Sequence, residues 1–224
     1  MTRQIQAALS DRSDFQAIAA WVRPDSTVLD LGCGDGTLLK YLRQTRNARG
    51  YGIDIADANV LACVQNGVNV IQSDLERGLA GFDAGSFDCV ILSQTLQAVR
   101  RTEEILLEML RVGREAIVSF PNFGRWDVRL QIALGRMPVS AELPYEWYNT
   151  PNVHLFTIAD FESFCSGHGI RVLDLPPAPD PQHAAADRRA GNDPVRLRDG
   201  RPRRDLVPRP RCPAAEPGLG CDDR

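Results

Sequence analysis

Lysine, paired cysteines and long hydrophobic runs are all scarce in this sequence. Lys40 is the only lysine among 26 basic residues, and the formal net charge is -3. This balance does not favour a nucleic-acid-binding surface. No stretch approaches the roughly 18 apolar residues of a membrane span, and the chain opens with MTRQIQAALSDRSDF rather than with a secretory signal. We therefore expect a cytoplasmic protein that binds neither nucleic acid nor membranes.

The six cysteines form no C-x-x-C pair and do not cluster with histidine. This spacing argues against a zinc site or a disulfide framework. Free cysteine is among the most buried residue types, so we expect buried thiols and no metal.

Aromatic residues are absent from the last part of the chain. Residues 176–224 hold ten of the fifteen prolines and ten arginines but no Phe, Trp or Tyr. Such a segment buries too little apolar surface to offset about 1 to 2 kcal/mol of backbone ordering per residue. We expect a folded domain over 1–175 and a disordered Pro/Arg-rich tail over 176–224. A divergent natural tail and a product of a shifted reading frame both fit this composition.

The first 175 residues alternate between two patterns. Apolar, β-branched runs typical of strands occupy 27–32, 49–55, 68–74, 87–94, 115–122 and 170–175. Helical patterns occupy part of 5–22, then 37–45, 56–65, 102–112 and 157–166. Parallel pairing requires long crossover connections, so this alternation predicts a doubly wound α/β fold with a mainly parallel sheet and helices on both faces. In such sheets ligands bind beyond the carboxyl ends of the strands.

A glycine-rich loop follows the first predicted strand. The sequence Asp30-Leu31-Gly32-Cys33-Gly34-Asp35-Gly36 leads directly into a helix. A dinucleotide site would place its third glycine at position 37, which is Thr37 here. Carboxylates beside the loop repel a diphosphate but attract the ammonium and sulfonium groups of S-adenosylmethionine. A nicotinamide-dependent oxidoreductase is therefore disfavoured.

Acidic residues also end the second and third predicted strands. Asp54 is placed to accept hydrogen bonds from ribose hydroxyls, and Asp74 with Leu75 is placed beside an adenine ring. Each has a simpler alternative, because Asp54 could be a solvated strand end and Asp74 could cap the next turn. Three acidic strand ends in order favour a nucleoside-binding crevice over a set of unrelated turns.

These motifs resemble those of a known family. VLDLGCGDG, YGIDI, IQSDLE and FDCVILSQTLQ look like the class I S-adenosylmethionine-dependent methyltransferase fold, and residues 93–165 closely resemble the methionine biosynthesis protein MetW family. The resemblance implies S-adenosyl-L-methionine or S-adenosylhomocysteine as cofactor and homoserine O-acyltransferase as partner. It also implies a role in methionine biosynthesis. The broader fold ends in two further strands, and the tail offers no apolar run for the second, so we expect the sheet to lack its last strand.

Carried over by position, the resemblance gives each motif residue a role. Asp30, Gly32, Gly34 and Gly36 would form the methionyl-side loop, and Ser93 and Gln94 would face the methyl group. It supports the same contacts for Asp54, Asp74 and Leu75 that their positions suggest. No catalytic residue is identified, because methyl transfer needs little beyond alignment of the acceptor.

Residues 120–164 hold nine of the fifteen aromatic residues. They could form an aromatic lid, line an acceptor site or present a partner-docking surface, with Trp126, Tyr145, Trp147, Tyr148 and His154 as candidate contacts. Two functions follow. The first is an S-adenosylmethionine-binding protein that supports homoserine acylation, and the alternative is an active small-molecule methyltransferase.

Overall fold

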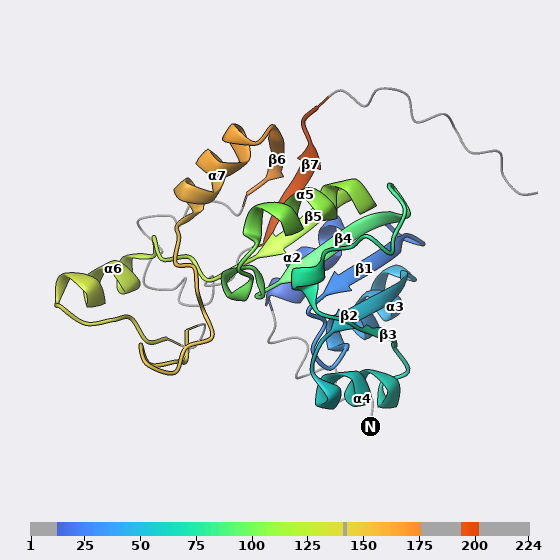
Figure 1. Ribbon diagram of the computed structural model, residues 1–224, viewed down its shortest axis with the longest axis horizontal. Helices are drawn as coiled ribbons and strands as arrows, with labels where there is room; N and C mark the ends of the chain where they lie inside the picture. Colours follow the sequence, from blue (N-terminus) through green and yellow to red (C-terminus); the bar gives the residue numbers. More distant parts are fainter. Residues whose placement is uncertain (1–12, 141–142, 176–193, 202–224) are drawn as a thin grey trace, which may run out of the picture.

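The structure is a computed structural model that describes residues 13–140, 143–175 and 194–201. Its centre is one seven-stranded sheet with the order β3-β2-β1-β4-β5-β7-β6 (Figure 1). The strands are β1 (Thr27–Leu31), β2 (Arg49–Asp54), β3 (Asn69–Gln72), β4 (Phe87–Ser93), β5 (Gly113–Ser119), β6 (Ile170–Asp174) and β7 (Pro194–Asp199). The first five pair in parallel, and β7 is antiparallel to both of its neighbours.

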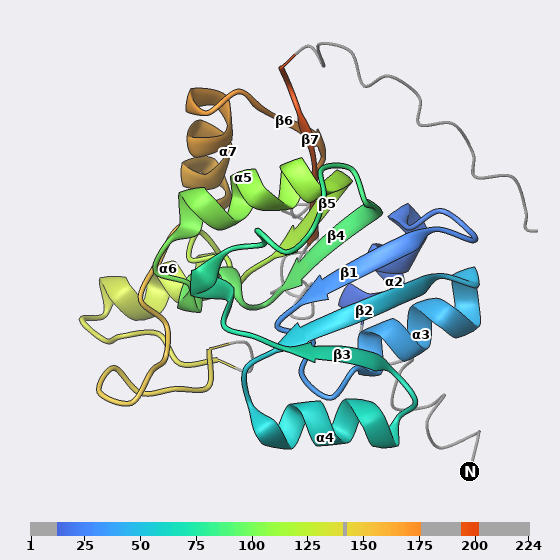
Figure 2. The same cartoon turned by 45° about the vertical axis from the view of Figure 1, so that its right-hand side comes forward.

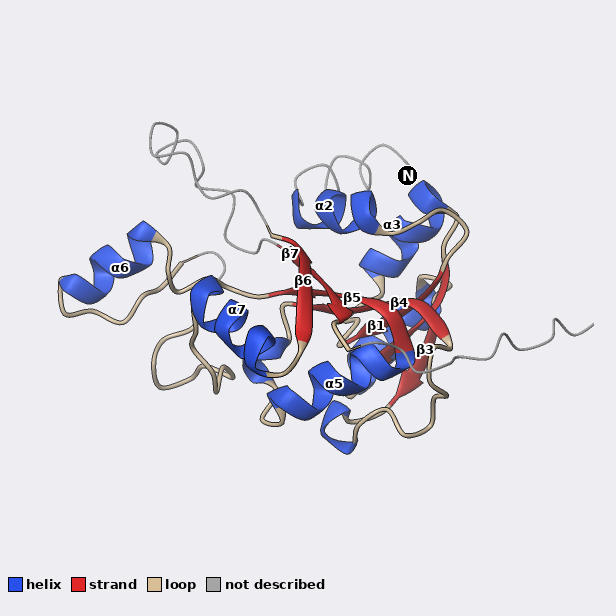
Figure 3. Ribbon diagram, turned by 90° about the horizontal axis from the view of Figure 1, so that it is seen from above, coloured by secondary structure: helices blue, strands red, loops and turns tan. Residues whose placement is uncertain are grey.

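Helices cover both faces of the sheet, as the alternating pattern predicts (Figure 3). On one face α2 (Ser13–Trp21), α3 (Thr37–Arg46) and α4 (Asp57–Gln65) pack with Val28 and Ile91 in one apolar cluster. On the other face α5 (Thr102–Val112) and α7 (Ile158–Gly167) pack with Leu29 and Val90 in a second cluster. Adjacent strand residues therefore point into different cores, and near-continuous apolar runs are the expected result. The doubly wound α/β prediction is confirmed.

The expectation that the sheet lacks its last strand is wrong. β7 lies between β5 and β6, with Val118 paired to Val195 and Ala116 paired to Leu197. Val195 and Leu197 are completely buried. The run Val-Arg-Leu-Arg alternates with period two, which is the pattern of a strand with one apolar face. The low apolar content of the surrounding residues hid this pattern.

The polar face of β7 is held by a buried carboxylate. Glu115 on β5 accepts a hydrogen bond from Arg23 Nη2 at 2.8 Å and pairs with Arg198. Arg196 Nε lies 3.9 Å from Glu115 Oε2 and 3.2 Å from Asp174 Oδ2. The folded domain thus extends to at least Asp199, beyond the predicted boundary at 175. The rest of the predicted disordered tail, 176–193 and 202–224, lies outside the described residues.

The segment between β5 and α7 holds the additional helix α6 (Trp126–Ala133). In Figures 1 and 3, α6 and its flanking loops lie beyond one end of the helix and sheet layers. Phe120 and Phe161 are buried and their ring centroids are 4.9 Å apart. Part of the predicted aromatic cluster is therefore core. No helix among the described residues is long and apolar enough to cross a membrane.

Candidate functional site

The carboxyl ends of β1 to β4 meet at one edge of the sheet, where the arrowheads point in Figure 2. The glycine loop begins there, between β1 and α3. Gly32, Gly34 and Gly36 have φ angles of 68°, 55° and 76°, which are left-handed values that favour glycine. The N–H groups of Gly32 and Cys33 both donate to the Ile53 carbonyl, at 2.8 and 3.0 Å. The loop is thereby folded tightly against the end of β2.

The loop is crowded on one side and open on another. A Cβ at Gly32 would lie 2.7 Å from Thr95 Oγ1, whereas a Cβ at Gly34 would meet no atom within 4 Å. Gly34 therefore lets a ligand approach the backbone closely, which a larger residue would obstruct.

Asp54 lies against the glycine loop. Its Oδ2 accepts the Gly34 N–H at 2.9 Å, and its Oδ1 accepts Ala56 N–H at 2.9 Å and Asn59 Nδ2 at 3.0 Å. The residue is buried, so it is not a solvated strand end. A carboxylate has about four acceptor positions, so three donors leave capacity for a ligand hydroxyl.

Asp30 is the penultimate residue of β1, just before this loop, and is only 2% exposed. Burial, and secondly the nearby Asp54 charge, raise the pKa of Asp30 to about 8. The protein thus keeps a carboxyl group in a place where the ionised form is costly without a compensating cation. A cationic group bound beside it would lower that pKa.

Asp74 follows β3 and begins the 3-10 helix η1 (Leu75–Arg77). Its Oδ1 accepts the Glu76 N–H at 2.9 Å, so Asp74 does cap the turn that follows β3. Asp74 and Leu75 are both half-buried. The Ser73 N–H donates to the Asp54 carbonyl at 3.1 Å, which places the end of β3 beside the end of β2. Oδ2 of Asp74 is not engaged by this cap.

The end of β4 carries backbone strain. Gln94 has a φ of 53°, a conformation that non-glycine residues rarely adopt. Its N–H donates to the Ser119 carbonyl at 2.8 Å, and the hydroxyls of Ser93 and Ser119 are 3.0 Å apart. Such strain clusters at functional sites when the surrounding contacts hold it in place.

Two residues at this edge escaped sequence reasoning. Asp14 on α2 is buried, and its Oδ2 lies 3.4 Å from Gln94 Nε2. Gln97 in the 3-10 helix η2 (Leu96–Ala98) donates through Nε2 to the Gln94 carbonyl at 2.8 Å. The Gln94–Asp14 contact spans 80 residues, so no local pattern could have revealed it.

The aromatic candidates do not close over the strand ends. Trp126, Tyr145, Trp147 and Tyr148 are 46% to 72% exposed. Only His154 is tied to the body of the fold, with its N–H 3.0 Å from the Gln97 carbonyl and its Nε2 3.4 Å from the Arg100 carbonyl. Both contacts are with backbone carbonyls, so they favour a structural role for His154.

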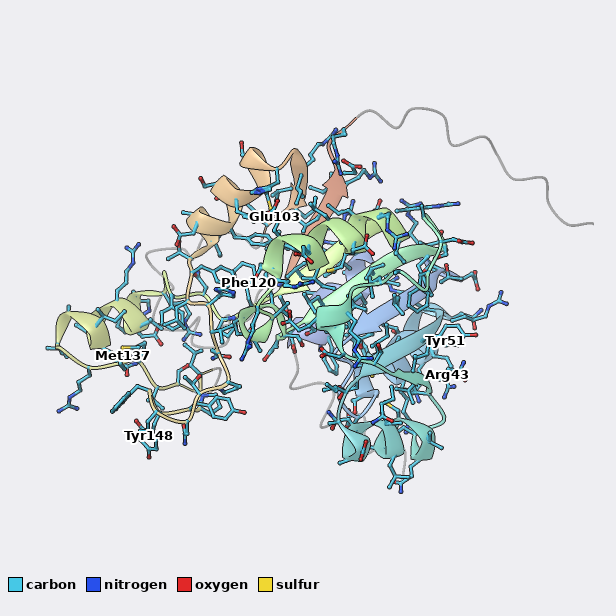
Figure 4. The ribbon with its side chains drawn as sticks, in the orientation of Figure 1. Arg43, Tyr51, Glu103, Phe120, Met137 and Tyr148 are labelled. Carbon is cyan, nitrogen blue, oxygen red and sulfur yellow. The ribbon has the colours of Figure 1, made fainter. Side chains whose placement is uncertain are left out.

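A cavity of about 350 Å³ lies elsewhere, at the edge where the strands begin. Arg43, Arg49 and Tyr51 line it, and none of the predicted site residues does. Figure 4 shows Arg43 and Tyr51 on the opposite side of the molecule from Tyr148.

Two buried thiols lie under the glycine loop. Cys33 Sγ and Cys63 Sγ are 3.7 Å apart, and Cys63 donates to the Gly34 carbonyl at 3.2 Å. Burial raises the pKa of both thiols, which keeps them protonated. Cys33, Cys63, Cys89 and Cys165 are all free and buried, as predicted. Cys212 and Cys221 lie outside the described residues.

The residues at the strand ends suit a cationic nucleoside. Asp30, Asp54 and Asp74 lie at or just beyond the carboxyl ends of three adjacent strands, and the space outside Gly34 is open to a ligand. Asp54 and Asp74, joined by Asp30 once a bound cation lowers its pKa, favour ammonium and sulfonium groups and oppose a diphosphate. Among the described residues, no group of His, Cys, Asp and Glu side chains is arranged to hold a metal ion.

Comparisons with known proteins agree with this arrangement. The family model for methionine biosynthesis protein MetW matches residues 12–189. A bifunctional methionine biosynthesis protein MetXA/MetW from Rhodopirellula baltica is 43% identical in an alignment of 157 residues that covers 66% of this chain and 25% of that protein. The chain thus spans about a quarter of the length of this curated relative.

Solved structures show the same fold. A chain of the complex between the Haloferax volcanii Trm112 methyltransferase activator and the putative methyltransferase is 16% identical, with a TM-score of 0.63 over 88% of this chain and 94% of that one. Magnesium protoporphyrin IX methyltransferase from Synechocystis, with bound SAH, is 18% identical, with a TM-score of 0.62 over 84% and 83% of the chains. At these identities the likeness establishes a Rossmann-like methyltransferase fold and nothing finer.

Proposed function

This chain belongs to the methionine biosynthesis protein MetW family, and on that basis we propose that it binds S-adenosylmethionine or S-adenosylhomocysteine and supports homoserine O-acyltransferase. The observation that carries the cofactor part is the joint position of Asp54 and Gly34. The carboxylate holds the Gly34 N–H at 2.9 Å while the glycine leaves its outer side open.

Each cofactor group would meet a suitable residue. The loop of Gly32, Gly34 and Gly36, with Asp30 beneath it, would bind the methionyl part. The free acceptor capacity of Asp54 would bind ribose hydroxyls. Asp74 Oδ2 and Leu75 would contact the adenine amino group and ring, and Ser93 and Gln94 would lie beside the methyl group.

The partner is supported by the organisation of a relative. In the Rhodopirellula protein a MetW part that is 43% identical to this chain is joined to a MetXA part, which is a homoserine acyltransferase. Covalent linkage keeps two folded units at millimolar effective concentration. We propose that this chain acts beside an acyltransferase of the same kind.

Calorimetric titration of the full chain with S-adenosylmethionine, S-adenosylhomocysteine and NAD tests the cofactor. We expect the first two to bind and NAD not to bind. Asp74→Asn keeps an acceptor for the Glu76 N–H but removes the charge, so it should weaken binding by about tenfold, as for one hydrogen bond to a charged group. Glu162→Gln, an exposed charge change on α7, is the matched control. A folded protein that ignores both nucleosides contradicts the proposal.

Acyltransferase activity with and without this chain tests the partnership. We expect a change in activity or the formation of a complex, and the absence of both contradicts this part of the proposal.

One observation favours methyl transfer to a small molecule as a second function. The buried Asp14 carboxylate lies 3.4 Å from Gln94, close to the proposed position of the methyl group. There it could take a proton from the small molecule that receives the methyl group. Acceptor-dependent formation of S-adenosylhomocysteine, lost in Asp14→Asn, is the expected signature. If no acceptor supports turnover while the cofactor binds, this function is excluded.

A further inference from the structure

The segment between β5 and α7 holds most of the exposed large apolar side chains of the described residues. Sixteen large apolar side chains are exposed among the described residues, and eleven of them lie between Trp126 and Leu155. Single exposed apolar residues are normal, whereas a concentration of them in one segment marks a candidate interaction site.

Helix α6 presents an apolar stripe to solvent. Trp126, Leu130 and Leu134 follow one another at intervals of four residues and are 52%, 50% and 70% exposed. Residues four apart lie on the same helix face. Val128 is the buried residue that attaches α6 to the body of the fold. A surface helix normally packs its apolar residues against the core. In α6 these three apolar side chains instead face solvent.

Two aromatic side chains on the loop that follows α6 are exposed as well. Trp147 and Tyr148 are 72% and 71% exposed, and their rings form an edge-to-face pair with centroids 5.8 Å apart. Figure 4 shows Tyr148 and Met137 on the same protruding part of the molecule. Trp and Tyr are the residues most often found as anchors at the centre of protein interfaces.

The charge of this segment narrows the class of occupant. Three arginines and three acidic residues fall between residues 125 and 146. Arg125 and Asp127 pair with each other at 3.0 and 2.8 Å. A segment whose sequence carries no net charge does not fit nucleic acid or an anionic membrane, whereas it fits a protein partner with apolar pockets.

We infer that Trp126, Leu130, Leu134, Trp147 and Tyr148 form the docking surface for the homoserine acyltransferase. This inference rests on the proposed function. Among the possible protein partners, the acyltransferase is favoured because a MetXA part is joined to the MetW part in the Rhodopirellula protein. The same segment is tied to the body of the fold further along, where the N–H groups of Val153 and His154 donate to the Gln97 carbonyl at 2.9 and 3.0 Å.

The test compares two double variants of the full chain. Leu130→Asp with Leu134→Asp places two charges in the proposed surface. Leu61→Asp with Val64→Asp is the matched control on α4, where these side chains are 59% and 62% exposed. Binding to the purified acyltransferase is measured by biolayer interferometry, and S-adenosylmethionine binding by calorimetry. We expect the first variant to bind the acyltransferase at least about 30-fold more weakly, with cofactor binding unchanged, and the control to bind normally.

The other outcomes distinguish failure of the docking surface from failure of the proposed function. Unchanged acyltransferase binding by the α6 variant refutes the docking surface and leaves the proposed function standing. If the wild-type chain neither binds the enzyme nor alters its activity, the proposed function itself fails. If the α6 variant only converts a self-associated protein to monomers, the surface serves a second copy and the inference is wrong. Should the α6 variant not fold, Trp147→Ala with Tyr148→Ala replaces it, with the same criteria.

Discussion

Replacement of Asp30 by asparagine should change how the stability of the ligand-free protein depends on pH. The folded pKa of Asp30 is about 8, against a reference value of 3.8. Between these values the folded state holds a proton that the unfolded state has released, so the free energy of unfolding falls as pH rises. One pKa unit corresponds to about 1.36 kcal/mol, so the loss between pH 5 and pH 8 is at most about 4 kcal/mol.

The amide side chain of the Asp30→Asn variant carries no proton to release in this pH range, so the variant should lack this loss. Urea unfolding at pH 5, 6, 7 and 8 measures it. The stability difference between Asp30→Asn and wild type should grow with pH in favour of the variant and level off near pH 8. A difference that stays constant from pH 5 to pH 8 refutes the assignment of a raised pKa to Asp30.

The same group should link ligand binding to proton release. A cationic ligand favours the ionised Asp30, so wild-type protein should release close to one proton on binding S-adenosylmethionine at pH 6.5. Calorimetry in two buffers with different ionisation enthalpies counts that proton. Asp30→Asn should release about one proton fewer, which separates its contribution from the titration of the ligand's own amino group.

Three further outcomes follow from other contacts. Asp54→Ala removes the acceptor of three hydrogen bonds, so it should lower stability by about 1 to 3 kcal/mol in urea unfolding and abolish cofactor binding; wild-type affinity would contradict the assigned role. Leu197→Ala, at a fully buried β7 position, should cost about 2 to 5 kcal/mol, whereas a change below about 0.5 kcal/mol would exclude β7 from the cooperative core. Gln97→Leu removes the hydrogen bond to the Gln94 carbonyl, so it should lower stability by about 1 kcal/mol in urea unfolding; an unchanged stability would show that this bond does not hold the strained backbone at Gln94.

The six early strands and the glycine loop could be predicted because their signals are local. In VLDLG and CVILS the strand pattern lies within a few residues. Gly32, Gly34 and Gly36 predict the left-handed backbone of the loop, because glycine favours positive φ. The order of acidic strand ends follows from parallel pairing, which places Asp54 and Asp74 at one edge. The fold class, and the gathering of these acidic residues at one edge of the sheet, could therefore be predicted from the sequence.

Contacts between distant segments account for what could not be predicted. Val195 and Leu197 form part of a strand because β7 pairs with both β5 and β6, which buries these two side chains. Glu115 on β5 also pairs with arginines of β7. Asp14 reaches Gln94 only after α2 has packed on the sheet. Likewise the residues of α6 do not reveal by themselves which side will face solvent. Amino-acid type and spacing specify local backbone conformation, whereas burial and pairing depend on which surfaces meet, and only the tertiary structure decides that.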